Sequence, residues 1–269
     1  MTARARRLGR GLGRGLVTGL CAGLALGVAG CADLGTESGR VAAIDFTGFP
    51  YPAVLTGDTL RDTLGVVAPL RATAYDAHGA VLTDAAITFV SPDTGVTIDA
   101  LGRLRTTRRP GSLRVFAAVD GLQSGGRTLL VTAAPDTMYA TSVTAPSVTY
   151  ALPDASTNLS PELAVAVRNR TDAAPAVTGW LVRWRTVHRG DTLAAGDTTL
   201  VALQSAAGRR ASLDTTTTAG ASTRRLRIFA NRLPTAVDTF TVLAEVRRHG
   251  VPVAGSPVRF TVRVAPPTP

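Results

Sequence analysis

The chain has 269 residues, of which 45% are apolar and 18% charged. That length allows two packed domains behind a targeting segment, and the composition excludes a disordered protein. All 29 basic residues are Arg. Of these, 24 follow residue 31, whereas the whole chain has 19 acidic residues. Because these arginines are spread along alternating segments and do not cluster beside exposed aromatic residues, we expect no nucleic-acid partner.

The first 30 residues have the organisation of a secretory signal peptide. Residues 1–15 are rich in Arg and Gly and contain no acid, and residues 16–30 are almost wholly apolar. That apolar run is shorter than the roughly 18 residues a membrane span needs, but it suits a signal peptide. We therefore expect an exported protein.

The apolar run ends in Val28-Ala29-Gly30-Cys31, which resembles the lipobox of bacterial lipoproteins. The resemblance implies cleavage between Gly30 and Cys31 and a lipid anchor on the Cys31 thiol. Two or three acyl chains would hold the protein stably at a membrane. The alternative is a conventional secretory signal with an incidental Cys. Ala32 follows the Cys where many inner-membrane lipoproteins carry Asp, which favours the outer membrane, and residues 31–40 read as an acylated Cys with a flexible tether.

Only Cys21 and Cys31 are present, so residues 32–269 cannot form a disulfide among themselves and must fold on their apolar cores alone. From Val41 onward, short alternating runs separated by turn signals predict an all-β fold. We expect two tandem immunoglobulin-like β-sandwiches, residues 41–135 and 136–269, after an N-terminal signal helix and a short tether.

In residues 41–135 the apolar positions alternate along several predicted strands. One strand carries Leu70, Ala72 and Ala74 inward, another Ile87 and Phe89, and a third runs from Leu113 to Val119, with a hairpin predicted between residues 96 and 106. The order of turns and strands resembles the bacterial immunoglobulin-like domain of group 2, a spacer and adhesion module without shared catalytic residues. The matching positions are Gly57-Asp58-Thr59, Asp76, Gly79, Leu82, Ser91, Asp93, Ile98-Asp99, Gly102, Leu104, Gly111, Leu113 and Val115.

In residues 136–269 the first stretch, to residue 156, reads as a connector that becomes a strand. Alternating strands are then predicted around residues 163–167, 180–185, 226–230, 240–246 and 258–264, whereas residues 188–222 are weakly patterned and read as an irregular excursion. The end of the chain, above all Gly255-Ser-Pro-Val-Arg-Phe-Thr-Val, loosely resembles a group-1 bacterial immunoglobulin-like or filamin-type sandwich.

Trp180 and Trp184 share one face of a predicted strand, opposite Arg183 and Arg185. One buried Trp on such a strand is typical of an immunoglobulin-like core. We therefore expect Trp180 to pack inside and Trp184 to be partly open, which makes the pair a candidate stacking platform for a glycan or peptide. Burial of both rings would instead mean core packing.

No catalytic or metal-binding motif stands out, so no enzyme activity, metal site or cofactor is expected. His78, His188 and His249 each sit at a predicted turn, where a solvent-exposed side chain is expected, and the Gly-Asp-Thr triplets at 57, 190 and 196 read as turns and not as Ca²⁺ loops. The sequence thus predicts a non-catalytic envelope lipoprotein acting as a structural, spacer or adhesion module. Its expected partners are the membrane, through Cys31, and an envelope protein or glycan.

Overall fold

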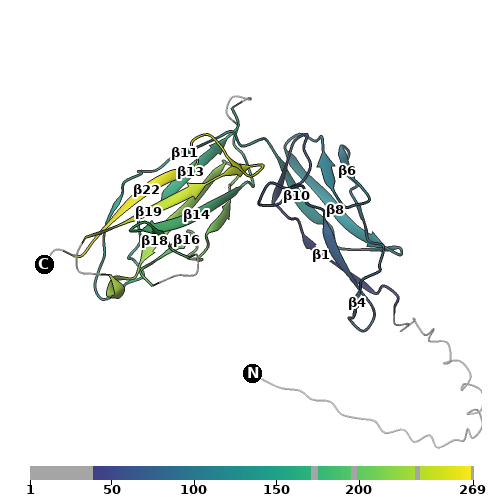
Figure 1. Ribbon diagram of the computed structural model, residues 1–269, viewed down its shortest axis with the longest axis horizontal. Helices are drawn as coiled ribbons and strands as arrows, with labels where there is room; N and C mark the ends of the chain where they lie inside the picture. Colours follow the sequence, from purple (N-terminus) through teal and green to yellow (C-terminus); the bar gives the residue numbers. More distant parts are fainter. Residues whose placement is uncertain (1–38, 171–174, 195–198, 234–236, 268–269) are drawn as a thin grey trace, which may run out of the picture. The chain divides into compact units, whose positions relative to one another are not determined.

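The computed structural model of the protein describes residues 39–170, 175–194, 199–233 and 237–267 (Figure 1). The predicted signal peptide, the cleavage point at Gly30 and Cys31, and nearly all of the tether lie outside the described residues. Gly39–Pro269 form one compact unit. Apart from one short 3₁₀ helix, every regular element in the described ranges is a β-strand.

Strands β1 to β10 pair only with one another in the part of the chain that is described, and we call them the first sandwich. Their sheets have the orders β1-β3-β4 and β2-β10-β8-β5, with β9 beside β8 and the hairpin β6-β7 separate. Their bounds are β1 Ala43–Gly48, β2 Ala53–Leu55, β3 Arg71–Tyr75, β4 Val81–Leu82, β5 Thr88–Val90, β6 Val96–Ile98, β7 Leu104–Thr106, β8 Gly111–Val119, β9 Leu122–Gln123 and β10 Arg127–Thr132.

Strands β11 to β22 form the second sandwich, with sheet orders β11-β13-β18-β16 and β12-β22-β19-β14-β15, and β17 also on the edge of β14. Their bounds are β11 Thr137–Ala140, β12 Ser147–Thr149, β13 Leu163–Arg168, β14 Leu181–His188, β15 Asp191–Thr192, β16 Val201–Gln204, β17 Leu213–Thr215, β18 Ala221–Ile228, η1 Ala230–Arg232, β19 Asp238–Glu245, β20 Arg247–Arg248, β21 Val251–Pro252 and β22 Val258–Ala265.

The strand order identifies an immunoglobulin-like topology. In the second sandwich, the sheet β11-β13-β18-β16 corresponds to strands A, B, E and D of an immunoglobulin domain. In the facing sheet, β22, β19 and β14 correspond to strands G, F and C. The first segment of each sandwich divides between the two sheets: β2 runs parallel to β10, and β12 runs parallel to β22. The predicted all-β sandwich fold is therefore confirmed.

Period-two alternation accounts for the cores. Along β8 the side chains of Leu113, Val115, Ala117 and Val119 are buried and point inward as predicted. The hairpin expected between residues 96 and 106 is β6-β7. Phe89 differs from the expectation, because it is only partly buried, packing its ring against Phe46 at a centroid distance of 5.5 Å.

The weakly patterned stretch from 188 to 222 is more regular than predicted. It contains β15, β16 and β17, which lie at the edges of the two sheets, and the first residues of β18. Strands of two to four residues are too short to establish a period, which is why the alternation did not predict them. The turn expected at Arg247 to Pro257 likewise contains the hairpin β20-β21.

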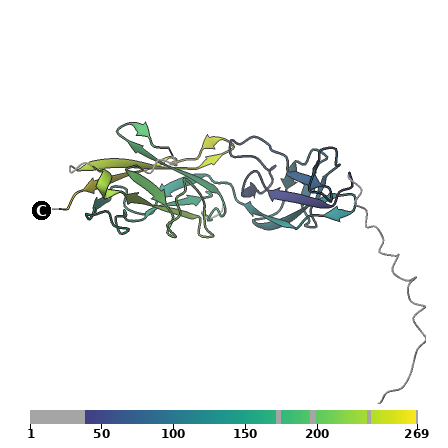
Figure 2. The same ribbon diagram turned by 90° about the horizontal axis from the view of Figure 1, so that it is seen from below.

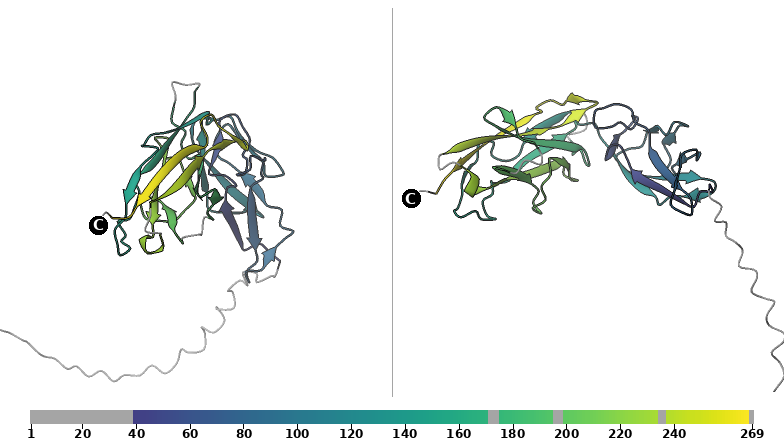
Figure 3. Two further views of the ribbon diagram at one scale, coloured as in Figure 1. Left: turned by 60° about the vertical axis from the view of Figure 1, so that its left-hand side comes forward. Right: turned by 60° about the horizontal axis from the view of Figure 1, so that its bottom comes forward.

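The hairpin β20-β21 lies at the end of the second sandwich that receives the chain from the first (Figure 2). There the amide of Ala254 donates to the carbonyl of Asp136, and Arg248 forms an ion pair with the Asp136 carboxylate at 3.0 Å. Strand β22 runs from this end to the opposite one, where the chain finishes (Figure 3). Among the described residues no helix is long and apolar enough to cross a membrane.

Candidate functional site

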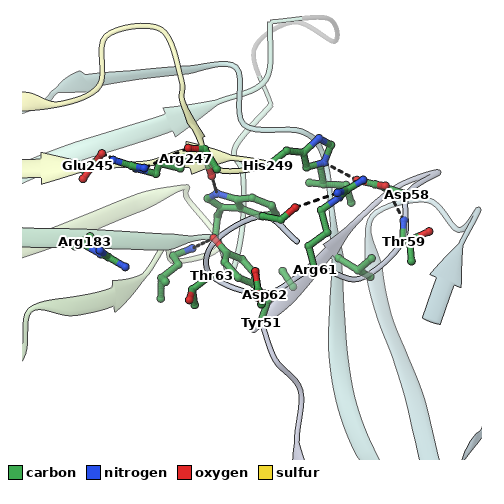
Figure 4. Close-up of a pocket in the computed structure, with 17 residues that line it drawn as sticks. Tyr51, Asp58, Thr59, Arg61, Asp62, Thr63, Arg183, Glu245, Arg247 and His249 are labelled. Atoms are coloured by element: carbon green, nitrogen blue, oxygen red, sulfur yellow. Dashed lines mark hydrogen bonds and ion pairs between the residues drawn. The ribbon is translucent and has the colours of Figure 1, made fainter. Parts of the chain in front are cut away.

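The most elaborate group of polar and aromatic side chains lies where the two sandwiches meet, and we call it the junction (Figure 4). It comprises Tyr51 and the turns at 55–66 from the first sandwich, and Trp180, Leu181 and the hairpin β20-β21 from the second. These residues line a partly open pocket of about 50 Å³. Such a volume holds a few water molecules and no drug-sized ligand.

Tyr51 is the aromatic centre of the junction. It stands between Pro50 and Pro52, two residues before β2 begins, and each proline favours an extended conformation in the residue that precedes it. Its ring packs against that of Trp180 at a centroid distance of 4.8 Å, and both residues are buried. The Leu181 amide donates to the Tyr51 hydroxyl at 3.2 Å. Burial raises the pKa of Tyr51, against the smaller opposing effect of this hydrogen bond, so the phenol stays neutral.

The hairpin β20-β21 supplies the polar half of the junction. His249 and Gly250 form its two-residue loop with φ angles of +50° and +79°, as a type I′ turn requires. This turn directs the His249 ring toward the first sandwich, where Nε2 lies 2.6 Å from Oδ2 of Asp58. Arg61 Nε lies 3.5 Å from the same Asp58 oxygen.

The charge of Asp58 is held in place by its neighbours. Burial opposes its ionisation, but the hydrogen bonds from the Thr59 amide and from His249 favour the carboxylate, as do the charges of His249 and Arg61. The net effect lowers the pKa of Asp58. Asp58 therefore joins the two sandwiches as an anion at neutral pH.

Two glycines allow the backbones to approach closely. Gly65 lies in the turn that follows Arg61, and a Cβ built on it would collide with the backbone of His249. A Cβ on Gly250 would come within 2.6 Å of the carbonyl oxygen of Leu64. Both glycines also have positive φ, so the turn and the hairpin tip meet only because neither residue has a side chain.

The expected aromatic platform does not exist at the surface. Trp180 is 5% exposed, as expected, but Trp184 is fully buried, so the prediction of a partly open Trp184 is wrong. Its ring stacks on Phe260 at 6.0 Å, and its Nε1 donates to Ser222 Oγ in the facing sheet. The sandwich does not end at Trp184, because β14 continues to His188, so this ring lies in mid-core. Because both rings are buried, both belong to the packed core, and neither offers a face to a glycan or peptide.

The histidines also depart from the expectation of exposed turn residues. His78 is exposed, but His188 is mostly buried, with its ring stacked on Phe240 at 4.5 Å and its Nε2 2.9 Å from Asp238 Oδ2. His249 is half-exposed and carries the contact to Asp58. In the described ranges no three His, Cys, Asp or Glu side chains gather as a metal site.

Sequence reasoning missed the junction as a site. Gly57-Asp58-Thr59 and His249-Gly250 were both predicted as turns, and both are turns, but nothing in the sequence pairs one with the other. Tyr51 between two prolines is the only local signal, and it was not singled out.

No known family profile matches the sequence, and no curated protein matches it. Among solved structures, domains 4 and 5 of the S-layer protein SbsC align over 84% of this chain and 99% of theirs, at 15% identity and a TM-score of 0.30. The Yersinia pseudotuberculosis adhesin InvE aligns over 71% of this chain and 52% of its own, at 17% identity and a TM-score of 0.31. The Escherichia coli adhesin FdeC aligns over 82% and 63%, at 17% identity and a TM-score of 0.30.

Proposed function

We propose that this protein is a non-catalytic, lipid-anchored module of the bacterial cell envelope, in which two braced immunoglobulin-like sandwiches act as a spacer or adhesion element. The junction is the observation that carries the proposal. A flexible pair of domains needs no contact beyond its linker. Here a hydrogen bond between residues 130 positions apart and a His–Asp contact between residues 191 positions apart connect the two sandwiches, beside the packed rings. Such a brace suits a protein that must hold a fixed reach from a surface.

The hydrogen bonds and ion pairs of the His and Asp side chains also support a non-catalytic role. Each of the three His side chains faces an Asp, and in each pair the Asp is further occupied by backbone amides or by Arg. At the junction the space between these groups is too small for a substrate. The sequence Val28-Ala29-Gly30-Cys31 supports the anchor, and Ala32 supports the outer membrane.

The anchor is tested by fractionating cells that express the full chain. We expect mass spectrometry of the mature protein to find acyl chains on Cys31, and Cys31→Ala to move the protein out of the membrane fraction. Cys21→Ala is the matched control, because Cys21 lies inside the segment expected to be removed, and that variant should stay membrane-bound. An unmodified N-terminus cut elsewhere, or a Cys31→Ala protein that remains in membranes, would refute the anchor.

The brace is tested by hydrogen exchange at one amide. In the wild-type chain the Leu181 amide donates to Tyr51 Oη, so it should exchange slowly, and Tyr51→Phe should speed its exchange about tenfold or more. Tyr139→Phe changes an exposed hydroxyl on β11 and should leave the Leu181 amide protected. A Leu181 amide that exchanges equally in the wild type and in Tyr51→Phe would mean that the sandwiches are not braced in solution.

A further inference from the structure

The net positive charge of residues 41–269 comes from the second sandwich. Residues 41–135 contain 8 Arg and 8 acidic residues, whereas residues 136–269 contain 15 Arg and 9 acidic residues. Six of those 15 arginines pair with carboxylates: Arg189, Arg224, Arg225, Arg227, Arg247 and Arg248. The other nine form no ion pair with a carboxylate of the described residues, and the excess charge belongs to them.

Three such arginines share the outer face of one sheet. Arg185 on β14, and Arg259 and Arg263 on β22, alternate with buried residues of their strands and are exposed. In the register of the sheet, Arg185 and Arg259 stand on either side of Leu243 in β19. Within the described ranges, none of the three forms an ion pair with a carboxylate. Arg183 lies on the same face, two residues before Arg185 on β14. It stands opposite Glu245 and is therefore left out of this group.

The residues between these arginines are suited to anions. Thr239, Thr241 and Thr261 occupy the intervening positions of the same face, and their hydroxyls can donate hydrogen bonds. Among the described residues, the one carboxylate on this face is that of Glu245, which lies at its edge, is buried, and pairs with Arg247 at 2.7 Å. In the part of the chain that the structure describes, the face thus presents cations and hydroxyl donors with no free acid among them. We call it the arginine face, defined by Arg185, Arg259 and Arg263.

The spacing of the arginines selects a polymeric ligand. Two strand spacings separate Arg185 from Arg259, about 10 Å, and four residues along β22 separate Arg259 from Arg263, about 13 Å. These are backbone spacings, and extended Arg side chains can bring two guanidinium groups to one small anion but not all three. A chain that carries an anionic group at regular intervals can contact each of them in turn.

We propose that the arginine face binds an extended anionic polysaccharide through its carboxylate, sulfate or phosphate groups, and this inference rests on the proposed envelope function. No aromatic side chain lies among the described residues of the face, so bases of a single-stranded nucleic acid would have no stacking partner. Leu243 and Val187 beside the arginines are partly buried, and Leu213 opposite Arg183 is an exposed aliphatic side chain of this face, so the face offers little to insert into a lipid bilayer.

The experiment measures binding of the full chain to immobilised heparin and to polygalacturonate, with neutral dextran as the blank. We expect both polyanions to bind at about 150 mM salt, dextran to fail, and affinity to fall steeply as salt increases. The triple variant Arg185→Gln, Arg259→Gln, Arg263→Gln should bind at least tenfold more weakly and with a shallower salt dependence. Because all three side chains are exposed, its thermal unfolding should match that of the wild type.

The matched control removes the same charge from the first sandwich. Arg71, Arg105 and Arg109 are exposed there, and their triple change to Gln should leave binding within about twofold of the wild type. Equal loss in both triple variants would show an unspecific response to net charge and would overturn the proposal. So would a wild-type chain that binds neither polyanion, or one that binds duplex DNA or anionic lipid vesicles more tightly than either polysaccharide. The assay needs no acylation, so a failed anchor test and a failed binding test are distinguishable.

Discussion

Nε2 of His249 lies 2.6 Å from Oδ2 of Asp58, and 191 residues of chain separate the two. The pair joins the tip of a hairpin in the second sandwich to a turn in the first. It stands beside the Tyr51–Trp180 ring contact and the Leu181–Tyr51 hydrogen bond, which also join the two sandwiches. The consequences of this arrangement can be measured at single residues.

The first prediction concerns pH. The pKa of Asp58 is lower in the folded protein than in the unfolded chain, where it is about 4. Its charge therefore stabilises the fold above about pH 4, and this contribution is lost as the pH falls through the lower, folded-state pKa. Asp58→Asn should lower the melting temperature at pH 6, and the difference from the wild type should shrink steadily below about pH 4.

Asp45→Asn serves as the control for that titration, because Asp45 is exposed on β1. Its melting temperature should follow the wild-type curve at every pH. If the Asp58→Asn curve runs parallel to the wild type down to pH 2, the Asp58 carboxylate does not contribute through its charge.

The second prediction concerns tryptophan fluorescence. Because Trp180 and Trp184 are both buried, acrylamide should quench the wild-type emission weakly. Tyr51→Ala removes the ring that covers Trp180, so about half of the emission should become quenchable while Trp184 stays shielded. Tyr139→Ala, at an exposed position of β11, should leave quenching unchanged. Strong quenching of both rings in the wild type would contradict the core positions of both tryptophans.

Much of the fold could be predicted because alternation reports burial directly. Leu113 to Val119 in β8 and Val258 to Val264 in β22 each alternate over seven residues, enough to establish which face is inside. Strands such as β16 and β17 have only four and three residues, so their apolar positions carry little periodicity. They are defined by the neighbours they pair with, which the sequence does not reveal.

The junction could not be predicted for a different physical reason. Tyr51, Asp58 and His249 each sit in a locally recognisable turn or proline segment, but their contacts depend on how the two sandwiches meet. The same cause explains the error at Trp184. Its local position, four residues before a polar turn, resembles a strand end, whereas Phe260 and Ser222 from distant strands enclose it.

The third prediction compares two phenylalanines. Phe240 is fully buried in β19, so Phe240→Ala should reduce the free energy of unfolding by about 3 to 5 kcal/mol. Phe89 is only partly buried, so Phe89→Ala should cost about 1 to 2 kcal/mol, less than its predicted core position implied. Denaturant unfolding of the full chain measures both. Equal costs would mean that Phe89 is better enclosed than its exposure indicates.

The last prediction separates backbone strain from contact across the junction. Gly65 and Gly79 have φ angles of +86° and +80°, so replacing either with Ala imposes a similar backbone penalty of about 1 to 2 kcal/mol. The space around them differs: a Cβ at Gly79 meets no atom within 4 Å, whereas one at Gly65 collides with the His249 backbone. Gly79→Ala should therefore destabilise the protein slightly and leave Trp180 shielded from acrylamide. Gly65→Ala must in addition push the 62–66 turn away from the hairpin β20-β21, which loosens the Asp58–His249 pair and lets the quencher reach Trp180. Equal quenching in the two variants, at equal loss of stability, would show that the close approach of Gly65 to His249 has no part in holding the sandwiches together.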